Sequence, residues 1–262
     1  MNIGDRMKQY ESISDLKLTS RLPIIIRLDG RAFHTVTRKM PKPSYNLLDA
    51  MSNAMKATAE DMETCFFGYT QSDEVTFILR NDQSFKSTPW FMNRVQKICS
   101  VVASDFTYNF VKEAYRLPIS RKTTFDARCF VVPNIEEAIN CLIWRQRDCN
   151  KNSVSMVVYE KLREKLGKKG AKQILNKKNI KDRLNILLND MGIDFYKMYD
   201  LSFINGIGTY KIPKEYKRKA KTDKEEETYI RTEWVIDKKL PIFSSDDGRE
   251  FLHSILDIQV IR

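Results

Sequence analysis

The sequence feature that most constrains the fold is an apolar run that ends in an acidic turn. Ile24-Ile25-Ile26 is β-branched and is soon followed by Asp29-Gly30. A run of this kind bounded by turn residues predicts a buried strand, and the glycine lets the backbone turn sharply. An acidic side chain then stands at the end of a central strand, where open α/β sheets bind ligands. A lone Asp-Gly is more commonly a simple turn, so this feature alone does not indicate a function.

A second acidic turn is predicted between residues 65 and 79. Val75, Phe77 and Leu79 recur every second residue, the period expected of a strand. We expect strand, turn and strand here, with the turn region at 68–72. Asp73 and Glu74 then stand at the mouth of a hairpin.

The two acidic turns suggest a metal site if the hairpin lies beside the first strand. In that case Asp29 and Asp73 converge. Two carboxylates with little to neutralise them favour Mg²⁺, which completes its ligand shell with water and phosphate. Such a pair suits two-metal catalysis of phosphoryl transfer. Two unrelated surface acids are the alternative that spacing leaves open.

Composition narrows the class of protein. The chain has 262 residues, 42% of them hydrophobic, which suits one large domain or a domain with an appendage. A net charge of +11 predicts a polyanionic partner. The five scattered cysteines form no Cys-x-x-Cys pair, so neither a zinc site nor a disulfide framework is predicted. No run reaches membrane-spanning length and residues 1–20 do not resemble a signal peptide. We expect no membrane partner and a cytoplasmic location, with a mitochondrial one left open.

The order of predicted elements indicates the fold class. A short helix and a linker are expected at 4–18, helices at 44–62, 87–114 and 135–166, and further strands at 123–132 and 228–236. Residues 196–211 suggest strand or loop, 216–227 a charged loop, and 251–261 a helix or a strand. The order β, α, β, β, α, β, α favours an α/β (α+β) fold: a palm-like sheet containing antiparallel strands, with helices on one side. We expect a catalytic region at 1–155 and a basic C-terminal region at 156–262 packed on it, within one structural domain.

The third quarter of the chain is strongly basic. Residues 161–183 contain ten Lys or Arg and two acids. We expect Gly167 and Gly170 to break the helix within this run. A segment of this charge predicts contacts with a nucleic-acid backbone, although shorter runs are usually only solvated surface.

The motifs of the chain resemble those of the tRNA-His guanylyltransferase superfamily, whose members add nucleotides to the 5′ end of tRNA in the 3′-to-5′ direction. The resemblance covers about residues 1–155 and weakens beyond about residue 185. It rests on motifs in the following order: Arg27-Leu28-Asp29-Gly30-Arg31, Phe33-His34, Lys42-Pro43, Tyr69-Thr70-Gln71-Ser72-Asp73-Glu74, Arg94 with Lys97, Phe125-Asp126-x-Arg128, and Trp144-Arg145-Gln146-x-Asp148-Cys149.

The resemblance implies a palm-like core related to polymerases and nucleotidyl cyclases, and a set of site residues. Asp29, Asp73 and Glu74 would be catalytic, and Asp29, Asp73 and the Gly30 carbonyl would hold two Mg²⁺ ions. Residues that handle triphosphates or the tRNA 5′ phosphate would be Arg27, Arg31, Ala32, Phe33, His34, Lys42, Ser72, Arg94, Lys97, Asp126 and Arg128. We expect tRNA contacts from Asn152, Lys161, Lys168, Lys169, Lys177, Lys178, Lys181 and Arg183.

One departure from the family pattern indicates a branch. The guanylyltransferase branch has His-Ile-Asn-Asn after the Asp-Cys pair, whereas Asn150-Lys151-Asn152-Ser153 stands here. The chain therefore resembles the guanylyltransferase-like branch, which repairs or edits 5′-truncated tRNA by copying the opposite strand. This implies a nucleotidyltransferase that uses ATP or GTP for activation and nucleoside triphosphates as substrates, binds the tRNA acceptor stem, and forms a homotetramer.

Three other functions are weighed against tRNA repair. A dedicated tRNA-His guanylyltransferase would add a single G. A nucleotidyl cyclase also uses paired aspartates on a palm-like sheet but has no need of a long polycation. A non-catalytic RNA-binding protein would account for the net charge but not for acids at two adjacent turns.

Overall fold

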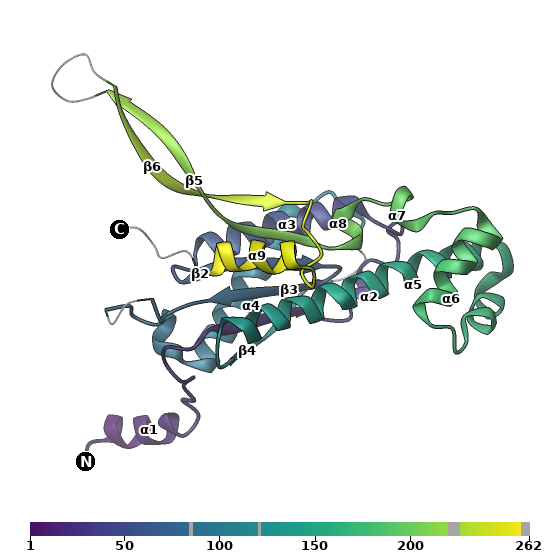
Figure 1. The fold of residues 1–262 in the computed structure, drawn as a ribbon. Helices are drawn as coiled ribbons and strands as arrows, with labels where there is room; N and C mark the ends of the chain where they lie inside the picture. The colour runs from purple at the N-terminus through teal and green to yellow at the C-terminus, as the bar shows by residue number, and fades with distance from the viewer. Residues whose placement is uncertain (84–85, 120–121, 220–225, 258–262) are drawn as a thin grey trace.

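The computed structural model describes residues 1–83, 86–119, 122–219 and 226–257. One six-stranded sheet of the described residues has the order β4-β1-β3-β2-β5-β6, and every neighbouring pair is antiparallel. Figure 1 shows the long strands β5 and β6 extending beyond the rest of the molecule. The strands are β1 (Ile24–Gly30), β2 (Cys65–Gln71), β3 (Glu74–Leu79), β4 (Phe125–Val131), β5 (Ile207–Lys219) and β6 (Glu226–Asp237).

Helices of very different lengths connect and flank the strands. They are α1 (Ile3–Ser12), α2 (Phe33–Val36), α3 (Tyr45–Glu60), η1 (Trp90–Asn93), α4 (Val95–Glu113), α5 (Ile135–Leu175), α6 (Ile180–Asn185), η2 (Ile186–Asp190), α7 (Phe195–Met198), α8 (Leu201–Ile204) and α9 (Asp246–Leu256). The series β1-α3-β2-β3-α4-β4 and the order β4-β1-β3-β2 are those of a split βαβ fold. The prediction of mixed helices and antiparallel sheet is confirmed.

Helices cover both faces of the sheet, so the expectation of helices on one side was wrong. Successive residues of a strand point to opposite faces. Ile24, Ile26 and Leu28 share a core with α3 and α4. Ile25 and Ile78 pack instead with the first half of α5 and with α9. The purely apolar beginning of β1 reflects burial on both faces.

Several predicted boundaries need correction. The hairpin turn is Ser72-Asp73, not 68–72, because Gly68 lies inside β2 and pairs with Phe77. The helix expected at 87–114 begins only at Val95, after η1. The stretch 196–211 holds most of α7, all of α8 and the start of β5, and the ends of the loop expected at 216–227 belong to β5 and β6.

Other predicted elements agree with the structure. The short helix expected within 4–18 corresponds to α1 and the helix expected at 44–62 to α3. The strands expected at 123–132 and 228–236 correspond to β4 and β6. The helix expected at 135–166 continues as α5 to Leu175. It leaves helical geometry at Gly167 (φ 71°) but not at Gly170. The C-terminal segment is helical in α9, and residues 258–261 of the predicted range lie outside the described part. No helix in the described part combines the length and hydropathy needed to cross a membrane.

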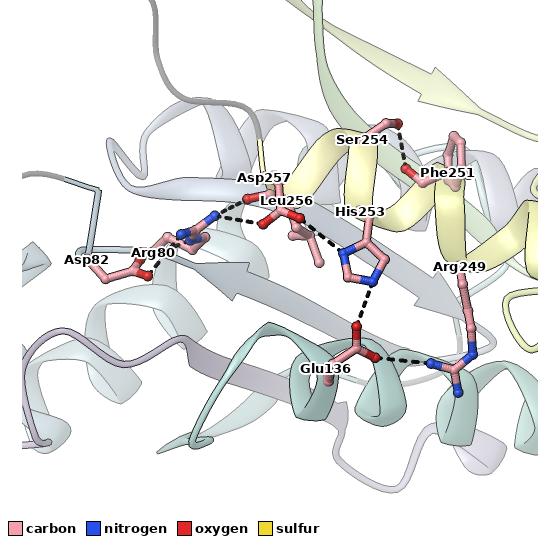
Figure 2. Close-up of polar contacts among 9 residues, drawn as sticks. All are labelled: Arg80, Asp82, Glu136, Arg249, Phe251, His253, Ser254, Leu256 and Asp257. Carbon is pink, nitrogen blue, oxygen red and sulfur yellow. Dashed lines mark hydrogen bonds and ion pairs between the residues drawn. The ribbon is translucent and has the colours of Figure 1, made fainter.

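Ionic contacts fasten α9 to α5 and to the end of β3 (Figure 2). His253 lies 2.7 Å from Glu136 and 3.0 Å from Asp257. Arg80, at the end of β3, pairs with Asp82 at 2.9 Å and with Asp257 at 3.5 Å. These contacts close the layer on the α5 side of the sheet, away from the acidic turns.

Candidate active site

The acidic turns predicted from the sequence lie side by side. Asp29 at the end of β1 is the register partner of Glu74 at the start of β3. The amide of Gly30 donates to the carbonyl of Asp73 at 3.1 Å. A Cβ on Gly30 would lie 3.0 Å from the Cβ of Asp73, so the close approach of the two turns requires glycine.

The Asp73 carboxylate stands in an unfavourable environment for its charge. Burial raises its pKa, a hydrogen bond from the Ser72 hydroxyl at 3.0 Å lowers it, and the neighbouring Asp29 raises it. Within the described residues, neither aspartate forms an ion pair with a Lys or Arg. The two carboxylates therefore favour a cation from solution.

The donor set fits magnesium that arrives with phosphate. Asp29 and Asp73 supply hard carboxylate oxygens, and the adjacent Gly30 offers a carbonyl. The described part of the chain contains no cluster of three or more His, Cys, Asp or Glu suited to a metal ion. Mg²⁺ is commonly held by one or two carboxylates together with water and substrate phosphate, which matches this sparse set.

Two hollows meet at the carboxylates. One cavity of about 360 Å³ is lined by Asp29, Asp73 and Glu74 and by apolar side chains of α3 and α5. A second cavity of about 330 Å³ lies against Gly30, α2 and the segment before α3. Asp73 lines both cavities, which also share Ser72, Ser44, Leu47 and Met156. Together they have the size of ordinary small-molecule sites.

The structure gathers some of the predicted phosphate-binding residues and not others. The second cavity is lined by Ala32, Phe33, His34, Lys42 and Ser72. Exposed Arg31 follows Gly30, and its amide donates to the Thr124 carbonyl at 3.0 Å.

The remaining predicted phosphate-binding residues lie outside both cavities. Arg27 is two residues from Asp29 on β1 and therefore on the same sheet face. Asp126 and Arg128 pair with one another at 3.3 Å on β4, opposite Asp29 and Arg27.

Two predicted phosphate-binding residues have partners elsewhere. Arg94 pairs with Asp15 at 3.0 Å. Lys97 lies over the Phe91 ring, 5.0 Å from its centroid.

Arg145 is a site residue to which the sequence reasoning gave no role. Its guanidinium donates to both oxygens of Glu74 at 2.5 and 2.6 Å and to Asp148 at 3.0 Å. Burial raises the pKa of Glu74, and the bond from Arg145 lowers it. The helical period of the sequence carries a signal for Arg145. It follows Leu142 by three residues and therefore lies on the same, buried face of α5.

Some of the predicted tRNA-binding residues are exposed, and others form ion pairs or hydrogen bonds within the protein. Exposed residues are Lys168, Lys169, Lys177, Lys178 and Lys181. Lys161 pairs with Glu164 at 3.6 Å, and Arg183 donates to Ser155 and to the Lys178 carbonyl. Asn152 lines the larger cavity and donates to Asp148 at 3.1 Å.

Comparison with known proteins identifies relatives of this chain and its fold. A family model described as tRNAHis guanylyltransferase matches residues 4–133. A tRNA(His) guanylyltransferase of Debaryomyces hansenii is 30% identical over 200 residues, which cover 72% of this chain and 73% of that protein. The enzyme of the same name in Schizosaccharomyces pombe is 31% identical over 155 residues.

The structural match extends over nearly the whole chain. A bacterial tRNA(HIS) guanylyltransferase (Thg1)-like protein in complex with ATP has a TM-score of 0.80 and 32% identity, covering 97% of this chain and 98% of that one. Its counterpart in complex with GTP has a TM-score of 0.76, 32% identity and coverage of 98% and 99%. The sequence alignments are shorter, and the match to the S. pombe protein covers 56% of each chain.

Proposed function

The chain belongs to the tRNAHis guanylyltransferase family, and on that premise we propose that it adds nucleotides to the 5′ end of truncated tRNA. The reaction is template-dependent and runs in the 3′-to-5′ direction. The observation that carries this proposal is the pair Asp29 and Asp73, which both line the 360 Å³ cavity, while Asp73 also lines the adjoining one. The structural relatives with ATP and with GTP support nucleotide binding at such a site.

The residues of the site have distinct roles in this proposal. Asp29, Asp73 and the Gly30 carbonyl would hold two Mg²⁺ ions, which when bound neutralise phosphate charge and activate a hydroxyl. His34 and Lys42 line the smaller cavity and would contact the triphosphate of the activating ATP or GTP. Arg27 and Arg128 are side by side on the sheet face that carries Asp29 and would contact the RNA 5′ phosphate.

The chemistry consists of two balanced displacements. First, an oxygen of the tRNA 5′ monophosphate attacks the α-phosphorus of ATP, forming a 5′-adenylylated end and releasing pyrophosphate. Next, the 3′ hydroxyl of an incoming nucleoside triphosphate attacks the 5′ phosphate of the tRNA, loses its proton and expels AMP. A tRNA that already carries a 5′ triphosphate needs only the second displacement and releases pyrophosphate.

Template-directed repair is favoured over addition of one G by the residues after Cys149. The chain has Asn150-Lys151-Asn152 where the guanylyltransferase branch has His-Ile-Asn. Pairing with the opposite strand of the acceptor stem would then select each nucleotide. We further propose that the basic segment 161–183 binds the tRNA backbone, that the catalytic region is 1–155 with 156–262 packed on it, and that the protein is a cytoplasmic homotetramer.

The test uses a 5′-labelled tRNA that lacks its first nucleotide, together with Mg²⁺, ATP and all four nucleoside triphosphates. We expect the wild-type protein to extend this RNA and to stop at the full acceptor stem. Asp73→Ala should abolish extension but retain RNA binding, because the basic segment is unchanged. Failure of the wild-type protein to extend any truncated tRNA would refute the proposal.

The same experiment separates the alternatives. A dedicated guanylyltransferase would add one G to tRNA-His whatever the opposing base. A cyclase would form cyclic nucleotide without RNA. A binding protein would retain RNA with no turnover, and Asp73→Ala would change nothing.

A further inference from the structure

Both carboxylate oxygens of Glu74 accept hydrogen bonds from one side chain. Arg145 Nε and Nη2 donate to its two oxygens at 2.5 and 2.6 Å, a bidentate geometry that fixes orientation as well as charge. The Glu74 side chain is 14% exposed and that of Arg145 is 8% exposed. A carboxylate with both oxygens held in this way is poorly placed to bind a cation as well.

Glu74 is also the direct continuation of the acidic turn. It follows Asp73 in the chain, so their Cα atoms are about 3.8 Å apart. It is the first residue of β3 and closes the Ser72-Asp73 turn through its register with Gln71. The Thr70 hydroxyl donates to the Glu74 carbonyl at 2.9 Å. A fixed Glu74 therefore restricts where Asp73 can lie.

The other end of the contact is firmly placed. Arg145 also donates to Asp148 at 3.0 Å, one turn along α5. Its neighbour Gln146 accepts from the Phe243 amide at 2.7 Å and donates to the Pro241 carbonyl at 2.9 Å. Leu142 of the same helix is fully buried in the core. Arg145 thus projects from a part of α5 that is fixed on two sides.

We propose that Arg145 is a positioning residue, which holds Glu74 and thereby keeps Asp73 facing Asp29 at the spacing that a divalent cation requires. The inference rests on the proposed function of the carboxylate pair. It changes the expected role of Glu74, which becomes the attachment point of the acidic turn.

A contribution to folding stability does not by itself explain why a buried ion pair stands here. Removing two charges from water is costly, and apolar pairs of similar volume are often as stable or more stable. An apolar pair, however, fixes no orientation comparable to two parallel N–H···O bonds. Orientation of the Glu74 side chain is the property that the ion pair supplies and an apolar pair would not.

The experiment compares Arg145→Met and Arg145→Lys with the double variant Glu74→Met/Arg145→Met. Arg147→Met is the matched control, since Arg147 is the same residue type two positions along α5 and is exposed. Binding of Mn²⁺ in the presence of a non-hydrolysable ATP analogue is followed by electron paramagnetic resonance. The kcat and KM for truncated tRNA are measured separately, and circular dichroism checks folding.

We expect Arg145→Met to weaken Mn²⁺ binding by about 10- to 100-fold, the usual effect of removing a residue that orients a metal ligand. Its kcat should fall while the KM for tRNA stays unchanged, and Arg145→Lys should recover part of both losses. The double variant should fold yet remain defective in Mn²⁺ binding. Arg147→Met should match the wild type.

The outcomes separate this inference from the proposed function. Wild-type Mn²⁺ affinity and kcat in the folded double variant would overturn the positioning role of Arg145, even if the protein extends tRNA. A wild-type protein that binds Mn²⁺ but extends no tRNA would overturn the proposed function. The Mn²⁺ affinities would then still decide the role of Arg145.

Discussion

Replacing Gly30 by alanine is the sharpest perturbation of the acidic site, because it adds one methyl group at the contact between the two turns. The new Cβ would overlap the Phe33 ring, with 2.8 Å to its Cγ, and would lie 3.0 Å from the Cβ of Asp73. Phe33 has little room to move, since it packs edge-on against Phe110 and tilted against Phe125. The strain therefore falls partly on Asp73.

The expected cost has two components. Forcing a methyl group into a packed contact costs about 1–3 kcal/mol of unfolding free energy. Displacing Asp73 by about 1 Å should reduce kcat on the order of 100-fold, as misplaced catalytic groups do. Gly68→Ala is the matched control, because its Cβ would lie 2.7 Å from Thr209 Cγ2 in the same sheet but not beside the acids.

Urea denaturation and extension of 5′-truncated tRNA measure the two components separately. Both variants should lose a similar amount of stability. At temperatures where both are folded, only Gly30→Ala should lose turnover. If Gly30→Ala retains wild-type kcat while its stability falls, the contact between the turns does not govern the chemistry and the reasoning about this site is wrong.

Three further measurements test other parts of the structure. Iodoacetamide at pH 7.5 should modify Cys99 before Cys65 and Cys149. The hydrogen bond between the Cys99 and Cys129 thiols lowers the pKa of Cys99 to about 7, whereas burial raises the pKa values of Cys65 and Cys149 to about 12; mass spectrometry showing the reverse order would contradict this. Arg80→Ala should lower the unfolding free energy by about 2 kcal/mol, since it removes charged hydrogen bonds from a side chain that is only 12% exposed. His253→Ala should cost about 0.5–1 kcal/mol because its partners are more exposed, and equal losses in urea denaturation would refute the distinction. Replacing Lys168 and Lys169 by alanine should reduce the slope of log affinity against log salt for tRNA by about 1–2, whereas an unchanged slope in anisotropy titrations would remove these residues from the RNA surface.

Local pattern accounts well for the strands and helices that carry the site. The β-branched run at Ile24 and the alternation from Val75 each predict a strand, and the acids at their ends follow from position in the chain. That Asp29 and Asp73 meet depends on β1 pairing with β3, which the spacing allows but does not determine. Roles of residues such as Lys42 follow from the family resemblance. Periodicity alone does not indicate them.

The features missed were those set by distant parts of the chain. Apolar β1 does not reveal that α9, more than two hundred residues later, covers one of its faces. Arg145 and Glu74 are 71 residues apart in the chain. Each is a charged residue of a type that is usually exposed, so the sequence gives no sign that the two form a buried pair. Gly68 suggests a turn because glycine favours turns, whereas in the structure it lies within β2 and packs closely against Thr209 of β5.

The long hairpin of β5 and β6 contains two regions of unequal strength. Near Thr209 it is part of the sheet, because β5 pairs with β2 on one side and with β6 on the other. Beyond Tyr210, β6 is the one strand among the described residues that pairs with β5, and the ribbon extends away from the body (Figure 1). A two-stranded ribbon is marginally stable by itself. Amide hydrogens at its base should therefore exchange with solvent only on global unfolding, while those around Tyr216 exchange through local separation of the strands that leaves the catalytic sheet intact.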